Sequence, residues 1–223
     1  MIRAVTFDVG GTLIEPWPSV GHVYAEVAAR HGWTGLSVEA LNREFGKAWA
    51  SLGVFRYTRA EWLGLVKATF GGVIAEPVGP ALFSELYEQF STPESWHVYK
   101  DVVPTLRVLS QLGLKLGIIS NWDRRLGPLL GLLGLREFFN AVIISCYAGE
   151  TKPSKLIYEK AVKRLGVPHE SILHVGDSLE ADVEGARKAG LQSVWLRRGK
   201  SKTGIDQISS LLQIEGLLRR VRD

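Results

Sequence analysis

Acidic residues stand directly after apolar runs at two places in the chain. Asp8 follows the run Ile2 to Phe7, and Asp177 follows the run Ile172 to Val175, with Asp182 five residues beyond it. A carboxylate at the end of a buried strand needs a partner, because burying an unpaired charge is costly. Two such acids favour a hard cation held by oxygen ligands, and magnesium with several waters fits best.

Two further polar motifs follow apolar runs. Ser120 and Asn121 end the run that begins at Lys115, and Lys152 precedes Pro153 where a helix is expected to begin. The serine could hydrogen-bond a phosphate oxygen or only cap the next helix. A lysine at a helix N-terminus joins its ammonium to backbone donors as an anion site, although a surface role is commoner.

Each of these signals also has a purely structural interpretation. Asp8 could belong to an ordinary Asp-Gly turn, and Asp177 with Asp182 could be the acidic first turn of a capped helix. His174 lies inside an apolar run and is expected to be a satisfied core histidine rather than a ligand. Cys146, the single cysteine, is expected to be inert core and is compatible with a reducing compartment.

The elements that would position these residues form an α/β pattern. Short apolar runs alternate with amphipathic helices after Val98, which is typical of a parallel sheet. The expected strands are 2–7, 115–119, 141–145, 172–175 and 193–196. Helices are expected to begin at Pro104, Leu126, Ser154, Leu179 and about Ile208. Ligands bind at the carboxyl ends of the strands in such sheets, so the polar motifs are expected to meet there.

The segment 16–96 differs from the rest of the chain. Its apolar residues recur at helical spacing, which predicts a bundle of about four helices. Ser19, Ser37 and Thr58 stand at expected N-caps. Since the first strand has the character of the later ones, the helical segment is an insertion into a core made of 1–15 and 97–223.

Composition limits the function classes. The 223 residues are 46% hydrophobic and 22% charged, which is typical of a soluble globular chain with ample core. The formal charge of +4 comes from scattered basic residues, so a nucleic-acid groove is not expected. No export signal and no apolar run long enough to cross a bilayer is recognised, and the cytoplasm is the expected location. The sequence leaves the oligomeric state open.

The order and spacing of the motifs resemble those of the haloacid dehalogenase-like hydrolase superfamily. Its four motifs match Asp8-Val-Gly-Gly-Thr12, Ser120-Asn121, Lys152-Pro153, and Gly176-Asp177 with Asp182. The resemblance spans essentially the whole chain and implies a Rossmann-like parallel sheet core with an inserted type-one helical cap. The stretches from Ser120 to Leu126 and from His174 to Asp177 are similar to the subgroup of the haloacid dehalogenase-like hydrolase domain-containing 3 and rhythmically-expressed-gene proteins.

The resemblance implies a magnesium-dependent phosphatase for a small phosphorylated substrate. Asp8 would form an aspartyl-phosphate that water hydrolyses, and Lys152 would neutralise charge on it. The implied phosphate-binding residues are Gly11, Thr12, Ser120 and Asn121. The implied metal ligands are Asp8, the backbone carbonyl of Gly10, and Asp177, with Asp182 orienting the site from behind.

Gly10 departs from the phosphatase pattern. That position usually holds a second aspartate, which protonates the leaving group, and losing such a group costs about 10²–10⁴ in rate. Haloacid dehalogenases and phosphonoacetaldehyde hydrolases also lack this aspartate. The Gly176-Asp177 pattern argues against the first, while the second would need a cap lysine such as Lys47 or Lys67, each expected on a solvated helix face. A weakly active or inactive phospho-ligand or protein-binding domain is the other alternative.

Overall fold

The structure is a computed structural model that describes residues 1–199 and 206–220. The chain divides into two compact units. One comprises Met1–Ile14 and Val98–Asp223, and the other comprises Glu15–His97. They are called the sheet unit and the helical unit below.

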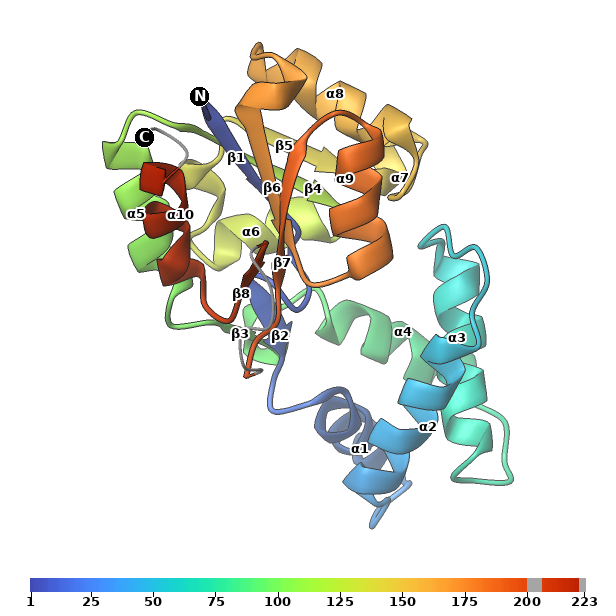
Figure 1. Ribbon diagram of the computed structural model, residues 1–223. Helices are drawn as coiled ribbons and strands as arrows, with labels where there is room; N and C mark the ends of the chain where they lie inside the picture. The colour runs from blue at the N-terminus through green and yellow to red at the C-terminus, as the bar shows by residue number, and fades with distance from the viewer. Residues whose placement is uncertain (200–205, 221–223) are drawn as a thin grey trace. The chain divides into compact units, whose positions relative to one another are not determined.

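A six-stranded parallel sheet is the centre of the sheet unit (Figure 1). Its order is β5-β4-β1-β6-β7-β8, with β1 between β4 and β6. The strands are β1 Ala4–Phe7, β4 Lys115–Ser120, β5 Ala141–Ile144, β6 Ile172–Gly176, β7 Gln192–Leu196 and β8 Gln207–Ile208. This arrangement confirms the predicted α/β, Rossmann-like class.

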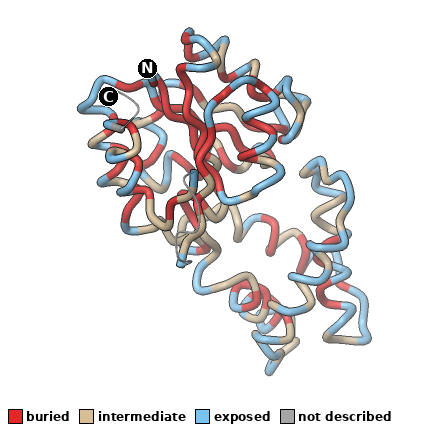
Figure 2. The backbone as a smooth tube through the Cα atoms, viewed as in Figure 1, coloured by how far each residue is buried: buried red, intermediate tan, exposed pale blue. Residues whose placement is uncertain are grey.

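Helices cover both faces of the sheet. The α5 and α10 helices pack together on one face, while α8 and α9 lie on the other (Figure 1). The helices are α5 Val102–Gln111, α6 Leu126–Leu132, α7 Ser145–Ala148, α8 Lys155–Leu165, α9 Gly185–Lys188 and α10 Ile214–Arg220. A π-helix, Leu179–Glu184, leads into α9, and 3₁₀ turns occupy Arg136–Phe138, His169–Ser171 and Leu211–Gln213. Burial on both faces explains why the central strands read as nearly continuous apolar runs (Figure 2).

The helical unit contains four helices, as the spacing of its apolar residues predicts. They are α1 Val20–Arg30, α2 Val38–Ala50, α3 Arg59–Gly71 and α4 Pro80–Gln89, followed by a 3₁₀ turn at Pro93–Ser95. The predicted N-caps Ser19, Ser37 and Thr58 are confirmed, since each side chain accepts a hydrogen bond from the first turn of its helix. Stacked rings of Tyr24 and Phe70 lie in the core of this unit.

One expected element is wrong, and the structure adds a second feature that the sequence did not indicate. The segment at Ile208 is a strand, because its backbone pairs with β7, and the last helix begins only at Ile214. Two short strands, β2 Ile14–Pro16 and β3 Trp96–Val98, form a separate ribbon that no periodicity signalled. Strands of two or three residues are too short to carry an alternation pattern.

Asp101 ties the start of α5 to the C-terminal segment. Its carboxylate accepts bonds from both terminal nitrogens of Arg198, each at 3.0 Å, from Ser210 Oγ at 2.7 Å and from the Leu211 N–H at 2.8 Å. Burial opposes ionisation of Asp101, but these donors lower its pKa below the usual value of 3.8. A carboxyl group with a lowered pKa stabilises the fold above its unfolded pKa and loses that contribution as the pH falls through its folded pKa.

We therefore expect Asp101→Asn to lower the free energy of unfolding at pH 7 by about 2 kcal/mol, since hydrogen bonds to a charged group are lost. The wild-type free energy of unfolding should fall as the pH drops below about 4, and the variant should show a weaker fall. Urea titrations between pH 3 and 7 measure both. Asp206→Asn is the control, because its pair with Arg187 is solvent-exposed and should contribute little. Equal acid sensitivity of Asp101→Asn and wild type would contradict the assignment.

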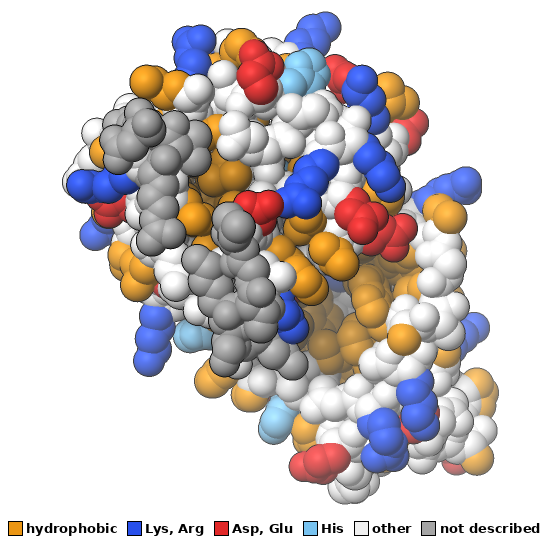
Figure 3. Space-filling view, viewed as in Figure 1, with side chains coloured by type: hydrophobic (Ala, Val, Ile, Leu, Met, Phe, Trp, Pro, Cys, Tyr) orange, Lys and Arg blue, Asp and Glu red, His pale blue; other side chains and the backbone are white. Residues whose placement is uncertain are grey.

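No helix within the described residues has the length and apolar character to span a membrane. On the face shown in Figure 3, the described lysine and arginine side chains lie interspersed with acidic and apolar ones. That distribution agrees with the scattered charge expected from the sequence.

Candidate functional site

Three neighbouring strands deliver polar residues to one edge of the sheet. Asp8 follows β1, Ser120 ends β4, and Asp177 follows Gly176 at the end of β6. Because β1 lies between β4 and β6 in parallel register, these ends are adjacent. The Asp8 N–H donates to the carbonyl of Val175 at 2.9 Å, which extends the pairing of β1 with β6 up to the acid itself.

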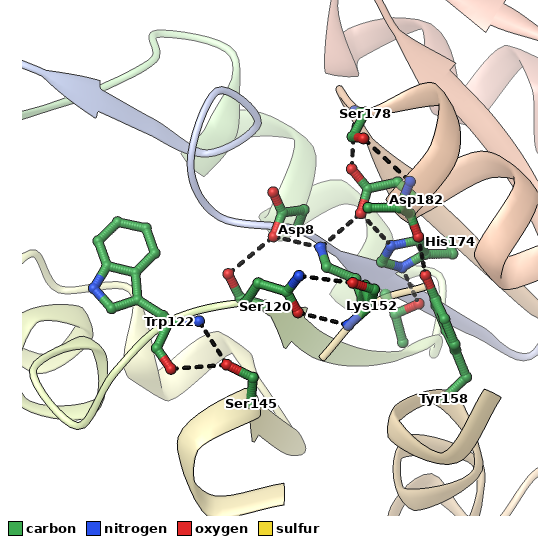
Figure 4. A network of polar contacts seen from close by, with 12 residues as sticks. Asp8, Ser120, Trp122, Ser145, Lys152, Tyr158, His174, Ser178 and Asp182 are labelled. Carbon is green, nitrogen blue, oxygen red and sulfur yellow. Dashed lines mark hydrogen bonds and ion pairs between the residues drawn. The ribbon is translucent and has the colours of Figure 1, made fainter. Parts of the chain in front are cut away.

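Asp8 is contacted by a hydroxyl and an ammonium. Ser120 Oγ donates to Asp8 Oδ1 at 2.9 Å, and Lys152 Nζ lies 2.7 Å from the same oxygen (Figure 4). The Lys152 side chain is only 2% exposed, so it is not the surface lysine of the structural interpretation. A buried ammonium at this distance pairs directly with the carboxylate.

Asn121 holds the loop that carries Lys152. Its side-chain amide accepts from the Lys152 N–H at 2.7 Å and donates to the Lys152 carbonyl at 3.0 Å. Both ends of the side-chain amide are therefore committed to backbone, and the phosphate contact of Asn121 stays a prediction. The following residue, Pro153, is joined through a cis peptide bond.

Asp182 is buried behind Lys152. Its Oδ1 lies 2.6 Å from Lys152 Nζ and 3.2 Å from His174 Nε2, and its Oδ2 accepts from the Ser178 N–H at 3.0 Å. The expected role of His174 as a satisfied core residue is confirmed, because both ring nitrogens have partners and the residue is fully buried. Lys152 is thus held between two carboxylates, those of Asp8 and Asp182 (Figure 4).

Glycines make room for the acids. Gly11 has φ +72°, and a Cβ there would lie 2.3 Å from Asp177 Oδ2. A Cβ on Gly176 would lie 2.2 Å from the carboxyl carbon of Asp182. Any larger residue at either position would displace a carboxylate, so the glycines follow from the packing of the acids as well as from the turn.

The acidic side chains form a group that could hold a cation. Oxygens of Asp8, Asp177 and Asp182 all lie within 4.8 Å of one another. The three carboxylates share one nearby ammonium, that of Lys152, which pairs with Asp8 and Asp182. Oxygen ligands and uncompensated negative charge are what a hard divalent cation requires, so the donor set fits such an ion.

The pKa values reflect this crowding. Burial raises the pKa of Asp8, and Lys152 only partly offsets the effect. The pKa of Asp177 is raised to about 7, although part of the residue is exposed. The larger cause is loss of contact with water, and the negative charges of Asp8 and Asp182 add to it. Burial opposes ionisation of Asp182 too, yet Lys152 and His174 bring its pKa below the usual range. A further cation near Asp8 and Asp177 would favour the charged forms of both carboxylates.

A family model for haloacid dehalogenase-like hydrolases matches residues 2–190. The chain belongs to the haloacid dehalogenase-like hydrolase family. This membership confirms the resemblance that the four sequence motifs indicate, and it identifies the chain as a hydrolase.

Related members of the family include proteins named as phosphatases. Haloacid dehalogenase-like hydrolase domain-containing protein 3 of Danio rerio is 36% identical, covering 92% of this chain and 89% of that protein. A glyceraldehyde 3-phosphate phosphatase of Methanopyrus kandleri is 33% identical over 90% of this chain and 86% of its own. The crystal structure of a HAD phosphatase from Thermococcus onnurineus matches with a TM-score of 0.70 and 26% identity, covering 97% of this chain and 98% of that one.

Gly11 and Thr12, two residues expected to bind phosphate, lie in the turn that follows Asp8. The Gly11 N–H donates to the carbonyl of Ile14 at 2.9 Å, so that donor is used within the turn. Thr12 is fully buried, and its Oγ1 has no hydrogen-bond partner among the described residues. The phosphate contacts of both residues stay predictions, and the proposal below is built on Ser120 and Lys152. Ser120 keeps its place, since its hydroxyl touches Asp8.

Trp122 lies beside the candidate site, a position that the sequence did not indicate. A Cβ on Gly10 would lie 3.4 Å from the Trp122 ring. Ser145 Oγ accepts from the Trp122 N–H at 3.0 Å and donates to its carbonyl at 2.9 Å, which fixes the backbone there (Figure 4). An indole ring therefore stands next to Gly10, the position at which the resemblance to phosphatases leads one to expect a second aspartate.

The structure also shows the surroundings of several basic residues and of the single cysteine. Arg198 donates to the carbonyl of Thr12 and pairs with Asp101. Arg125 pairs with Asp123 at 2.6 Å. Cys146 is exposed, so the expectation of a core position is wrong. Lys47 and Lys67 are both exposed, as expected for residues on a solvated helix face.

Proposed function

We propose that the chain is a magnesium-dependent phosphatase that acts on a small phosphorylated substrate through an aspartyl-phosphate on Asp8. The observation that carries the proposal is the joint contact of Asp8 with Lys152 at 2.7 Å and with Ser120 at 2.9 Å. A carboxylate paired with a buried ammonium, at the open edge of a parallel sheet, is suited to attack phosphorus. The phosphatase names of two related proteins support the substrate class.

In the proposed reaction, an Asp8 oxygen forms a bond to phosphorus while the bond from phosphorus to the substrate oxygen breaks. The departing oxygen takes the electron pair and needs a proton unless it is a stable anion. The Lys152 ammonium offsets the charge that gathers on the phosphoryl oxygens, and the Ser120 hydroxyl donates to one of them. Water then hydrolyses the acyl phosphate and restores the Asp8 carboxylate.

The carboxylates of Asp8 and Asp177 and the carbonyl of Gly10 would hold the magnesium ion. When bound, the ion supplies positive charge to the phosphoryl oxygens and to the nucleophile. Asp182 is left out of this ligand set, because both of its oxygens already accept hydrogen bonds from Lys152, His174 and Ser178. We propose that Asp182 instead holds Lys152 in place.

The remaining parts of the proposal concern the whole chain. The helical unit is proposed to act as the cap that selects the substrate, on the strength of its insertion between β1 and β4. We propose no nucleic-acid or membrane partner and a cytoplasmic location, in line with the scattered charge and the single cysteine. Gly10 keeps a second candidate open, a domain that binds a phosphorylated ligand without turnover.

The test is an assay with an activated aryl phosphate, whose leaving group departs without a proton. We expect turnover that requires magnesium and stops on chelation. Titration of magnesium by calorimetry runs in parallel. Magnesium binding with no turnover of aryl, acyl or alkyl phosphates would favour the binding domain, and absence of both would overturn the proposed site.

Removal of one proposed ligand should be visible without any activity. Wild-type protein should gain thermal stability with magnesium, by about 2.7 kcal/mol when the ion is at 100 times its dissociation constant. Asp177→Asn should fold but lose that gain, since the amide replaces a charged ligand. Differential scanning calorimetry with and without magnesium measures this. Glu180→Gln is the control, because this nearby acid is exposed and outside the cluster. An unchanged gain in Asp177→Asn would remove that residue from the metal site.

A further inference from the structure

A continuous line of polar contacts runs from the interior of the sheet to the proposed nucleophile. Thr6 Oγ1 lies 2.9 Å from His174 Nδ1, and His174 Nε2 lies 3.2 Å from Asp182 Oδ1. The line continues through Lys152 Nζ to Asp8 (Figure 4). Thr6 and His174 are both fully buried and face each other in the register of β1 with β6.

The position of His174 is an unusual place for a polar ring. The residue lies inside a strand whose neighbours are apolar, and the Tyr158 ring packs edge-on against it at 5.6 Å. A buried imidazole costs free energy unless both nitrogens are hydrogen-bonded. An apolar side chain could fill the same space, so packing by itself does not explain why a polar ring stands here.

The two hydrogen bonds of His174 require opposite roles of its two ring nitrogens, one as donor and one as acceptor. A neutral imidazole has one nitrogen that donates and one that accepts. If the Thr6 hydroxyl donates to Nδ1, the ring proton must be on Nε2, where it points at Asp182 Oδ1. The carboxylate then receives donors from His174, Lys152 and the Ser178 N–H, which fixes its rotation.

We propose that His174 is a positioning residue, which aims Asp182 and, through it, the Lys152 ammonium at Asp8. The proposal rests on the proposed function, because Lys152 is the group that it positions. His174 itself touches neither the nucleophile nor the open edge of the site. Partners of this kind behind a functional group typically contribute about 10–100-fold to activity.

The kinetic experiment compares His174→Phe, Thr6→Val and Thr6→Ser with wild type on the activated aryl phosphate. We expect His174→Phe to lower kcat about 10–100-fold with little change in KM, since the phosphoryl contacts remain. Thr6→Val should lower kcat in the same direction, and Thr6→Ser should restore it because the hydroxyl returns. The double variant Thr6→Val with His174→Phe should be no slower than His174→Phe alone, since both changes break one line of contacts.

Ser193→Ala is the matched control. Ser193 lies beside His174 in the register of β6 with β7, and its buried hydroxyl has no hydrogen-bond partner among the described residues. Its removal should leave kcat unchanged. If kcat of folded His174→Phe equals that of wild type, the positioning role is overturned. Should His174→Phe fail to fold, Thr6→Val and Thr6→Ser decide the matter by the same criterion.

Nitrogen NMR of the imidazole provides a readout that does not need turnover. We expect a protonated Nε2 and an unprotonated Nδ1 on His174 in wild type, with that pattern disturbed in Thr6→Val and kept in Thr6→Ser. A proton on Nδ1 in wild type would overturn the assignment. An inactive wild-type protein that still shows the expected pattern would contradict the proposed function, whereas an active one with equal variants would contradict only the role of His174.

Discussion

Asp8→Asn should lower turnover of the activated aryl phosphate by at least about 10⁴-fold, which is the scale of losing a covalent nucleophile. An amide oxygen lacks the negative charge needed to attack phosphorus, while its shape preserves the site. The Ser120 hydroxyl and the Lys152 ammonium, which now contact Asp8 Oδ1, can both donate to the amide oxygen in its place. Initial rates and thermal unfolding of the two proteins together separate chemistry from stability.

The covalent step can be tested directly on the same pair of proteins. Wild-type enzyme quenched in acid during turnover should carry a phosphoryl group on the peptide that contains Asp8, and Asp8→Asn should carry none. Glu180→Gln should behave like wild type, because that exposed acid is outside the cluster. Residual turnover in Asp8→Asn above one tenth of wild type would place the nucleophile elsewhere.

The meeting of these residues at one edge of the sheet was predictable because each lies at or just after the end of an apolar run. In a parallel sheet, the ends of such runs meet at one edge, so Asp8, Ser120 and Asp177 could be brought together from their positions alone. Family membership then confirmed the class of enzyme, a hydrolase. Neither step required the geometry of a side chain.

The roles of Gly11 and Thr12 were not predictable in the same way. Both follow Asp8 within four residues, yet Gly11 lies against the Asp177 carboxylate and Thr12 is fully buried. These outcomes depend on how the turn folds back through Gly11 to Ile14. Arg198 was missed for a related reason, because its partners Asp101 and Thr12 are far from it in sequence. A charge on a long side chain carries no local sign of what it will contact.

Gly10→Asp should raise the hydrolysis of alkyl phosphates, whose leaving groups need a proton. A general acid typically contributes about 10²–10⁴ in rate, so this range is the upper bound for the gain. The structure permits the substitution, because Gly10 is not among the residues with positive φ and its Cβ would meet the Trp122 ring at 3.4 Å. Rates for aryl and alkyl phosphates of rising leaving-group pKa, measured on both proteins, give the two slopes.

The wild-type enzyme should show the steeper slope, because no side chain at position 10 can donate a proton. Gly10→Asn is the matched control, since it adds the same bulk beside Trp122 without an acid and should keep the steep slope. A gain shared by the aspartate and asparagine variants would be an effect of shape rather than of proton transfer. If wild type and Gly10→Asp have equal slopes, the proton reaches the leaving group from a source other than the side chain at position 10. In that case the general acid would not be supplied from position 10. The substrate would then be sought among phosphates that carry their own proton donor.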